Sequence, residues 1–141
     1  MADETGGGRV VEFFAPMRRP PMATAANGKR TDRRSGRVYD SESLAAARDT
    51  IEAAIAPHRP PQPLTGPIGV ELRWCYPLKG RHRQGEPYTS KPDIDNTRKA
   101  VYDALARLGF IEDDRFICED RCFQAWWEPS GLYVRIWEVV A

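Results

Sequence analysis

Residues 91–114 read KPDIDNTRKAVYDALARLGFIEDD, a stretch that joins a paired-carboxylate motif to a helix and then to a second acidic pair. Pro92 disfavours helix for the residue before it, so we expect the stretch to begin as extended chain. In extended chain, side chains two positions apart point the same way, which lets Asp93 and Asp95 converge on one spot. Asp95 or Asn96 can then cap the helix that follows.

The predicted helix has an apolar face and a polar face. The apolar face repeats at three- and four-residue steps, as a buried helix stripe requires, through Thr97, Val101, Ala104, Leu105 and Leu108. Asp95, Lys99 and Asp103 repeat at four-residue steps on a different face. Gly109 is in the usual place for the residue that ends a helix.

The acidic run after this helix offers further oxygen ligands. If Glu112, Asp113 and Asp114 fold back beside Asp93 and Asp95, three carboxylates and one lysine share a pocket. Hard oxygen ligands of this kind suit Mg²⁺ or Mn²⁺. The sequence therefore predicts a divalent metal site, and the rest of the chain offers no comparable cluster.

The flanking sequence predicts an α+β domain. Alternating or β-branched and aromatic residues favour strands at Val10–Phe14, Ile68–Tyr76, Phe116–Trp127 and Leu132–Val140. A second helix runs from Asp40 or Ser41 to about Ala56 and buries Leu44, Ala47, Ile51, Ala54 and Ile55. Residues 15–38 read as one long loop. We expect residues 1–8 to be disordered and residues 9–141 to form a single domain, with a mixed sheet and two main helices packed on it.

Composition limits the class of protein. The chain has 141 residues, 41% of them hydrophobic and 29% charged, which is typical of one globular domain. No apolar run approaches the roughly 20 residues that a membrane-spanning helix needs, and the acidic, Gly-rich start is unlike a signal peptide. Three cysteines, Cys75, Cys118 and Cys122, favour free thiols in the cytoplasm. A zinc site at Cys118 and Cys122 is disfavoured, because His58 and His82 lack ligand spacing.

A net charge of +1 conceals separate basic and acidic blocks. Any one basic residue fits a solvated surface, but grouping in loops beside an acidic cluster favours a phosphate-bearing partner. The candidate phosphate contacts are Arg18, Arg19, Lys29, Arg30, Arg33, Arg34, Arg37, Lys79, Arg81, Arg83, Lys91 and Arg98.

Several motifs together resemble the RusA family of Holliday junction resolvases. They are KPDIDN at 91–96, Lys99, DAL at 103–105 and the acidic pair at 113–114, preceded by PMRRPP at 16–21, GRVYDSES at 36–43 and PYTS at 87–90. The resemblance covers about residues 10–140. It implies a homodimeric endodeoxyribonuclease that binds four-way DNA junctions in recombination and repair. It also implies paired symmetric nicks that require Mg²⁺, for which Mn²⁺ can substitute.

The resemblance also assigns roles to residues. Asp93, Asp95 and Asp114 match the metal-binding carboxylates, and Lys99 matches the essential lysine. Positions near the site correspond to Asn96, Asp103 and Asp113. Without the resemblance, the sequence favours a salt bridge of Lys99 with Asp95 or Asp103 over a catalytic role. Where the family commonly has Ser-Gln after the acidic pair, this chain has Arg115-Phe116, which leaves the surroundings of Asp114 and the DNA preference open.

Other interpretations stay open at this point. The protein could be a nuclease for forks or flaps, or a non-catalytic protein that binds branched DNA and uses the acidic cluster as a structural metal site. Tyr88 could stack at an opened junction or be an exposed tyrosine without a role. The aromatic residues of the last two strands suit either the core or a dimer interface.

Overall fold

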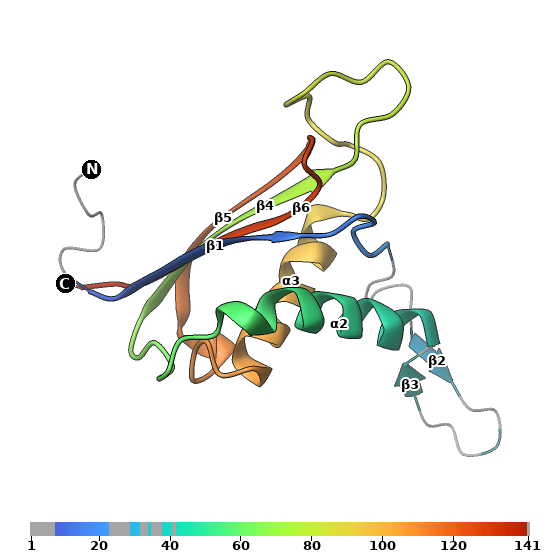
Figure 1. The fold of residues 1–141 in the computed structure, drawn as a ribbon. Coiled ribbons are helices and arrows are strands. Elements are labelled where there is room, and N and C mark those ends of the chain that lie inside the picture. Colours follow the sequence, from blue (N-terminus) through green and yellow to red (C-terminus); the bar gives the residue numbers. More distant parts are fainter. Residues whose placement is uncertain (1–7, 23–28, 32–33, 35–37, 41, 141) are drawn as a thin grey trace.

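The structure, a computed structural model, describes residues 8–22, 29–31, 34, 38–40 and 42–140, with backbone alone for residues 29–31, 38–40, 42 and 43. Its centre is a four-stranded mixed sheet with two helices on one face, which confirms the α+β prediction (Figure 1). The strand order is β1 (Val10–Pro16), β6 (Gly131–Glu138), β4 (Ile68–Tyr76) and β5 (Ile117–Trp126). β6 pairs antiparallel with both β1 and β4, and β5 pairs parallel with β4.

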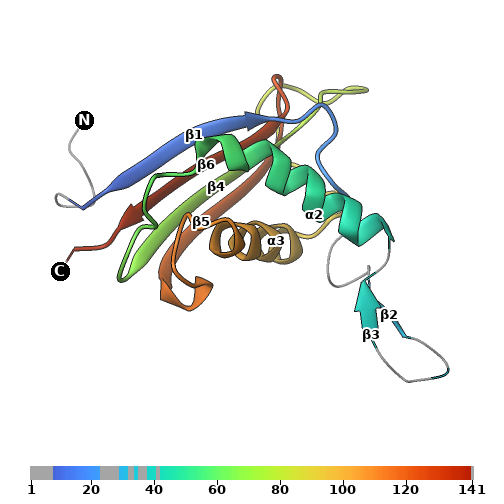
Figure 2. The same cartoon turned by 60° about the horizontal axis from the view of Figure 1, so that its bottom comes forward.

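Helices α2 (Glu42–Ile55) and α3 (Ile94–Arg107) lie together on one face of the sheet (Figure 2). The predicted stripe of α3 is buried, with Leu108 half-buried at its end. Gly109 follows with a φ of 83°, as expected of a residue that ends a helix. The helix begins earlier than predicted, because Asp93 and not Asp95 or Asn96 occupies the N-cap position.

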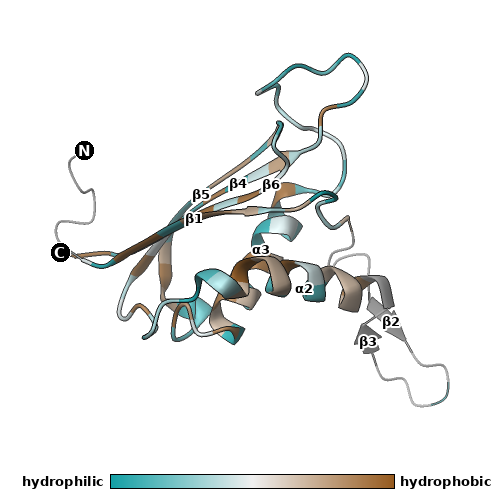
Figure 3. Ribbon diagram, in the orientation of Figure 1, coloured by the Kyte–Doolittle hydropathy of each residue, from teal (hydrophilic) through white to brown (hydrophobic). Residues whose placement is uncertain are grey.

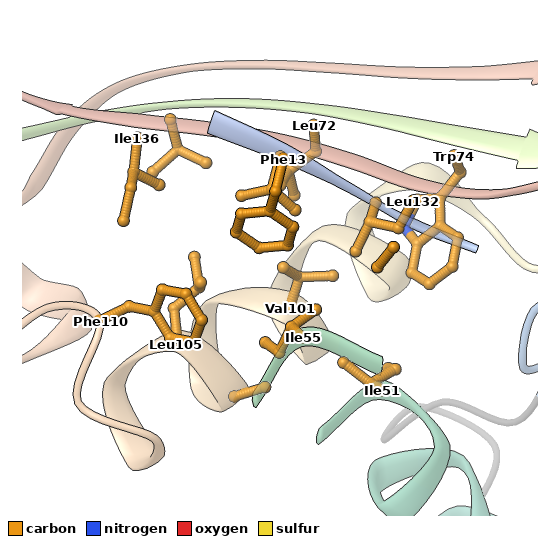
Figure 4. Close-up of a cluster of buried hydrophobic side chains, with 14 of the residues drawn as sticks. Phe13, Ile51, Ile55, Leu72, Trp74, Val101, Leu105, Phe110, Leu132 and Ile136 are labelled. Atoms are coloured by element: carbon orange, nitrogen blue, oxygen red, sulfur yellow. The ribbon is translucent and has the colours of Figure 1, made fainter. Parts of the chain in front are cut away.

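The hydrophobic core fills the space between the sheet and the two helices (Figure 4). Alternate residues of β4 are buried as predicted, and Leu72 and Trp74 belong to the same cluster as Val101 of α3 and Ile55 of α2. Full burial of one large apolar side chain contributes roughly 1.5–3 kcal/mol. This shared core therefore fixes the position of α3 relative to the sheet.

The segment expected to be one long loop is partly ordered. Within it, β2 (Lys29–Thr31) pairs antiparallel with β3 (Val38–Asp40), so the prediction of a structureless loop was wrong for these residues. A Lys-Arg-Thr strand has no apolar alternation that could reveal it, because its order comes from pairing. Two short 3₁₀ turns, η1 (Ala56–His58) and η2 (Asp114–Phe116), follow α2 and precede β5.

The last two strands of the chain flank β4 and are not neighbours of each other. β4, α3 and β5 form a β-α-β unit that puts β5 at the edge of the sheet, beside α3 (Figure 2). The loop from β4 to α3, at the top of Figure 3, is largely hydrophilic. The three cysteines are free thiols, as expected. None of the described helices is long and apolar enough to span a bilayer.

Candidate functional site

Two adjoining hollows lie along α3 and β5. The first has a volume of about 500 Å³ and is lined by Asp95 and Lys99 of α3, by Asp114, and by Asp120 of β5. The second, of about 490 Å³, lies between residues 88–94 and the C-terminal half of β5 and contains Asp93. The fold thus brings Asp95, Lys99 and Asp114 to one hollow and places Asp93 in the next.

The carboxylate of Asp114 is influenced by two other carboxylates, those of Asp113 and Asp103. Partial burial, a hydrogen bond to Asp113 and repulsion from Asp103 raise the pKa of Asp114. The pKa of Asp113 is instead lowered, because the backbone N–H of Arg115 donates a hydrogen bond to its carboxylate at 3.0 Å. Such crowding of like charges around Asp114 favours the approach of a cation.

The two residues that depart from the family pattern pack on each other. The guanidinium carbon of Arg115 lies 4.8 Å from the centre of the Phe116 ring, and its Nε lies 4.0 Å from Asp113 Oδ2. Arg115 therefore offsets part of the charge of Asp113. Asp114 is the member of the pair that lines the first hollow.

Arg98 links two carboxylates of the first hollow. Its Nη2 donates to Asp95 Oδ1 at 3.1 Å, and its Nη1 lies 3.5 Å from Asp120 Oδ2. The hydroxyl of Tyr102 donates to the same oxygen of Asp120, and burial together with this bond raises the pKa of Tyr102. The sequence motifs do not identify Asp120 or Tyr102 as site residues. Strand periodicity was the available signal, because Asp120, Cys122 and Gln124 alternate along β5.

Gln124 of β5 anchors the loop that carries the first aspartates. Its Nε2 donates to the carbonyl of Pro92 at 3.2 Å, and its Oε1 accepts from the hydroxyl of Thr97 at 2.7 Å. Its backbone carbonyl accepts from the N–H of Tyr88 at 2.9 Å. Gln124 therefore fixes both sides of Asp93 and the first turn of α3 to the sheet.

Tyr88 belongs to this anchored loop and is not an exposed residue. Only 9% of it is accessible, its ring stacks on Tyr76 with centroids 3.8 Å apart, and its hydroxyl donates to the carbonyl of Lys91 at 2.7 Å. The interpretation of Tyr88 as a solvent-exposed tyrosine was wrong, because the loop folds back onto the aromatic end of the core.

Asn96 and Asp103 lie beside the site on the side of α2. Both line a narrow third hollow between α2 and α3, together with Arg48 and Lys99. Lys99 therefore borders both this hollow and the first one. Asp103 also contributes to the raised pKa of Asp114, which connects the two hollows electrostatically.

The basic residues predicted to contact phosphates differ in their surroundings. Seven of them are exposed: Arg18 and Arg19 after β1, Arg34 in a turn, and Lys79, Arg81, Arg83 and Lys91 in the loop from β4 to α3. Arg98 is half-buried and bound to the acidic residues. The side chains of Lys29 and Arg30 and the whole of Arg33 and Arg37 lie outside the described residues.

The donor set fits a hard divalent cation in its chemistry. Asp95 and Asp114 share a hollow, Asp93 lies in the adjoining one, and all three offer carboxylate oxygens. In the described parts of the chain, no three carboxylate, histidine or cysteine side chains already meet at one point. Asp95 and Asp114, which line the same hollow, are thus the first candidates to hold the ion, and Asp93 in the adjoining hollow is the third.

The chain is similar to known proteins over most of its length. Residues 19–137 match the family model described as Endodeoxyribonuclease RusA. A Bacillus subtilis (strain 168) protein described as "Uncharacterized protein YqaN" is 27% identical over 121 residues, which cover 77% of this chain and 84% of that protein.

Proposed function

Because the chain belongs to the RusA family of Holliday junction-resolving endodeoxyribonucleases, we propose that it cuts four-way DNA junctions by paired, symmetric, Mg²⁺-dependent nicks. Members of this family hydrolyse phosphodiester bonds and depend on divalent metal ions. The finer points that we propose are the identity of the metal, the symmetry of the nicks, the homodimer and the residues that act. Free thiols and a DNA substrate suit a protein of the cytoplasm.

The observation that supports these residues most directly is the first hollow, where a lysine stands among carboxylates. In our proposal Asp93, Asp95 and Asp114 hold the cation, and Asp103 and Asp113 keep Asp114 in place. When bound, the cation supplies an activated water molecule and neutralises phosphate charge. Lys99 contacts the scissile phosphate and offsets the charge that develops on it.

The basic loop between β4 and α3 supports a DNA substrate. Its exposed Lys79, Arg81 and Arg83 follow the β4 strand and precede Asp93 in the chain. Contacts to backbone phosphates position DNA without reading its sequence. A twofold homodimer would present two such loops and two sites to a junction of matching symmetry.

The experiment that tests the function is cleavage of a mobile four-way junction by the full chain, read on a strand-resolving gel. We expect paired symmetric nicks with Mg²⁺ or Mn²⁺ and none with EDTA. Forked and linear duplexes of the same sequence measure the preference for junctions. Preferred cleavage of forks would favour the alternative of a fork or flap nuclease, and tight binding without nicks would favour a binding protein.

Variants test the residues. We expect Asp95→Asn and Asp114→Asn to abolish nicking while junction binding is retained, and Lys99→Met to slow nicking by about a hundredfold or more. Asp49→Asn, on an exposed position of α2, serves as the matched control. Normal nicking by Asp114→Asn would contradict the proposed site.

A further inference from the structure

The face of the sheet opposite the helices carries ordered rows of side chains. Figure 2 shows both helices on one side, so this second face is uncovered by them. Across β1, β6, β4 and β5, the pairing registers align a charge row, which consists of Glu12, Arg135, Glu71 and Arg121. The next row along the strands, the aromatic row, consists of Phe14, Tyr133, Arg73 and Phe123.

The polar groups of these two rows already have partners within the chain. Arg73 Nε donates to Glu71 at 3.0 Å, and the guanidinium of Arg73 lies 5.1 Å from the centre of the Phe123 ring. Arg121 lies over the same ring at 5.5 Å, and the hydroxyl of Tyr133 donates to Glu12. Burial of such a face costs little, because few polar groups would lose a partner.

The composition of this face resembles the centre of a protein interface. Tyrosine, phenylalanine, tryptophan and arginine are the residues enriched there. Phe123 and Trp127 are each 41% exposed, and an apolar hollow of about 410 Å³ lies between them and Phe14. Within the described chain, this is an aromatic surface that the two helices leave uncovered.

The charge of the face favours a protein and not a nucleic acid. Its three arginines, Arg73, Arg121 and Arg135, are matched by three glutamates, Glu12, Glu71 and Glu119. A surface that binds a phosphate backbone needs a net positive charge. The basic loop residues, in contrast, lie beyond the ends of the strands.

The order of residues along the rows is complementary to itself. A twofold axis parallel to the strands, placed between two copies of the face, reverses the strand order of one copy relative to the other. The charge row Glu-Arg-Glu-Arg then faces Arg-Glu-Arg-Glu. At its exposed ends, Glu12 of one copy meets Arg121 of the other, whereas Arg135 and Glu71 in the middle are largely buried within each copy. In the aromatic row, Phe14 meets Phe123 and Tyr133 meets Arg73. This arrangement is similar to the common aligned packing of two sheets, in which the sheets lie face to face about 10 Å apart.

We infer that a second copy of this chain docks on the charge row and the aromatic row, sheet against sheet, about a twofold axis parallel to the strands. This inference specifies the surface of the homodimer in the proposed function, and rests on that function for the homodimer itself. The α3 helices, which carry the candidate sites, then lie on the two outer sides of the sandwich and remain open to DNA.

Sedimentation velocity of the full chain over a concentration series tests the interface without any measurement of cleavage. We expect a wild-type dimer. Glu12→Arg or Arg121→Glu alone puts like charges opposite each other at both ends of the row, and should raise the dimer dissociation constant about tenfold or more. The double variant restores opposite charges and should return the constant to within about threefold of wild type. Asp49→Arg, on the outer side of α2, is the control.

Three outcomes would overturn the inference: a monomeric wild type, single variants that are folded and dimerise like wild type, or a double variant weaker than both singles. Thermal unfolding of each variant establishes that it is folded. If Glu12→Arg does not fold, Phe123→Asp, at a position exposed in the monomer, takes its place and should weaken the dimer equally. Junction nicking by the wild-type protein reports separately on the proposed function.

Discussion

Gln124 links the sheet to the loop of the first aspartates through both ends of its amide. Loss of two such hydrogen bonds costs about 1–3 kcal/mol of stability, and it also frees Asp93 and the first turn of α3 to move. We expect Gln124→Ala to raise the Mg²⁺ concentration for half-maximal nicking severalfold, as measured by titration of the metal at saturating junction.

Gln84 offers a matched control for this variant. Its amide also makes two hydrogen bonds, at 2.7 Å and 3.0 Å, but to the backbone of Glu128, away from the aspartates. Gln84→Ala should lower stability without a change in the Mg²⁺ requirement. An equal shift of the metal titration in both variants would assign Gln124 a purely structural role.

Arg98 and Arg81 should differ in their effect on DNA binding, although the sequence suggested the same role for both. Arg98 is bound to Asp95 and Asp120, whereas Arg81 is exposed in the basic loop. Each lost phosphate contact lowers the slope of log affinity against log salt by about 0.9. We expect Arg81→Ala to lower this slope and Arg98→Ala to leave it unchanged, in junction-binding titrations between low and moderate salt. A lower slope for Arg98→Ala would show that Arg98 exchanges its carboxylates for a phosphate.

The residues of the candidate site were partly predictable. Asp93, Asp95, Asp114 and Lys99 were predicted to share a pocket. Three of them line one hollow, whereas Asp93 lies in the next. Asp120 and Gln124 were missed because their positions depend on how β5 pairs with β4 and packs against α3, which local spacing does not encode. The family resemblance did not reveal them either, because it was carried by the motifs of the loop and helix.

At the scale of elements, the start of β6 requires a glycine for two reasons. Gly131 has a φ of 150°, and a Cβ there would lie 2.3 Å from the carbonyl oxygen of Ala15 in β1. Gly80 also has a positive φ, 63°, but a Cβ there would meet nothing within 4 Å. Gly80→Ala should cost about 1–2 kcal/mol for the backbone alone, and Gly131→Ala about 1–3 kcal/mol more.

Chemical denaturation of both variants at one protein concentration measures this difference. Equal losses of unfolding free energy would mean that β1 moves away from β6 without cost, and that the β1–β6 contact is not tight. A larger loss for Gly131→Ala would place the constraint at the contact between the strands.

Local periodicity predicted the elements better than their arrangement. The stripe on α3 and the alternation in β4 are properties of a few consecutive residues, and both were confirmed. The insertion of β6 between β1 and β4 depends on contacts between residues more than 50 positions apart, such as Val70 with Ile136. No short-range pattern distinguishes this order from a β5–β6 hairpin.

At the scale of the whole molecule, Glu138 joins three distant segments and makes stability depend on pH. Hydrogen bonds from the backbone of Thr65 and from the side chain of Arg9 lower the pKa of Glu138 to about 2. A carboxylate with a depressed pKa stabilises the fold above its unfolded pKa of roughly 4.3. Its contribution is lost as the pH falls from about 5 towards 2.

We therefore expect wild type to lose unfolding free energy more steeply than Glu138→Gln between pH 5 and about pH 2.5. Urea denaturation at several pH values measures the two slopes. Thr65→Val removes only the hydroxyl bond to Glu138 and keeps the backbone donor, so its slope should lie closer to that of wild type. Parallel slopes for wild type and Glu138→Gln would contradict the role of this carboxylate.

The interior position of β6 affects the order in which the strands can pair during synthesis of the chain. β6 is bounded by β1, the first strand of the sheet, and by β4. On the ribosome, β1 and β4 emerge long before the strand that must separate them. β4 can pair with β5 once β5 has emerged, but β1 and the other edge of β4 have no strand partner until residue 138 has left the exit tunnel. Nascent chains therefore expose strand edges, which a chaperone would be expected to cover until translation has passed β6.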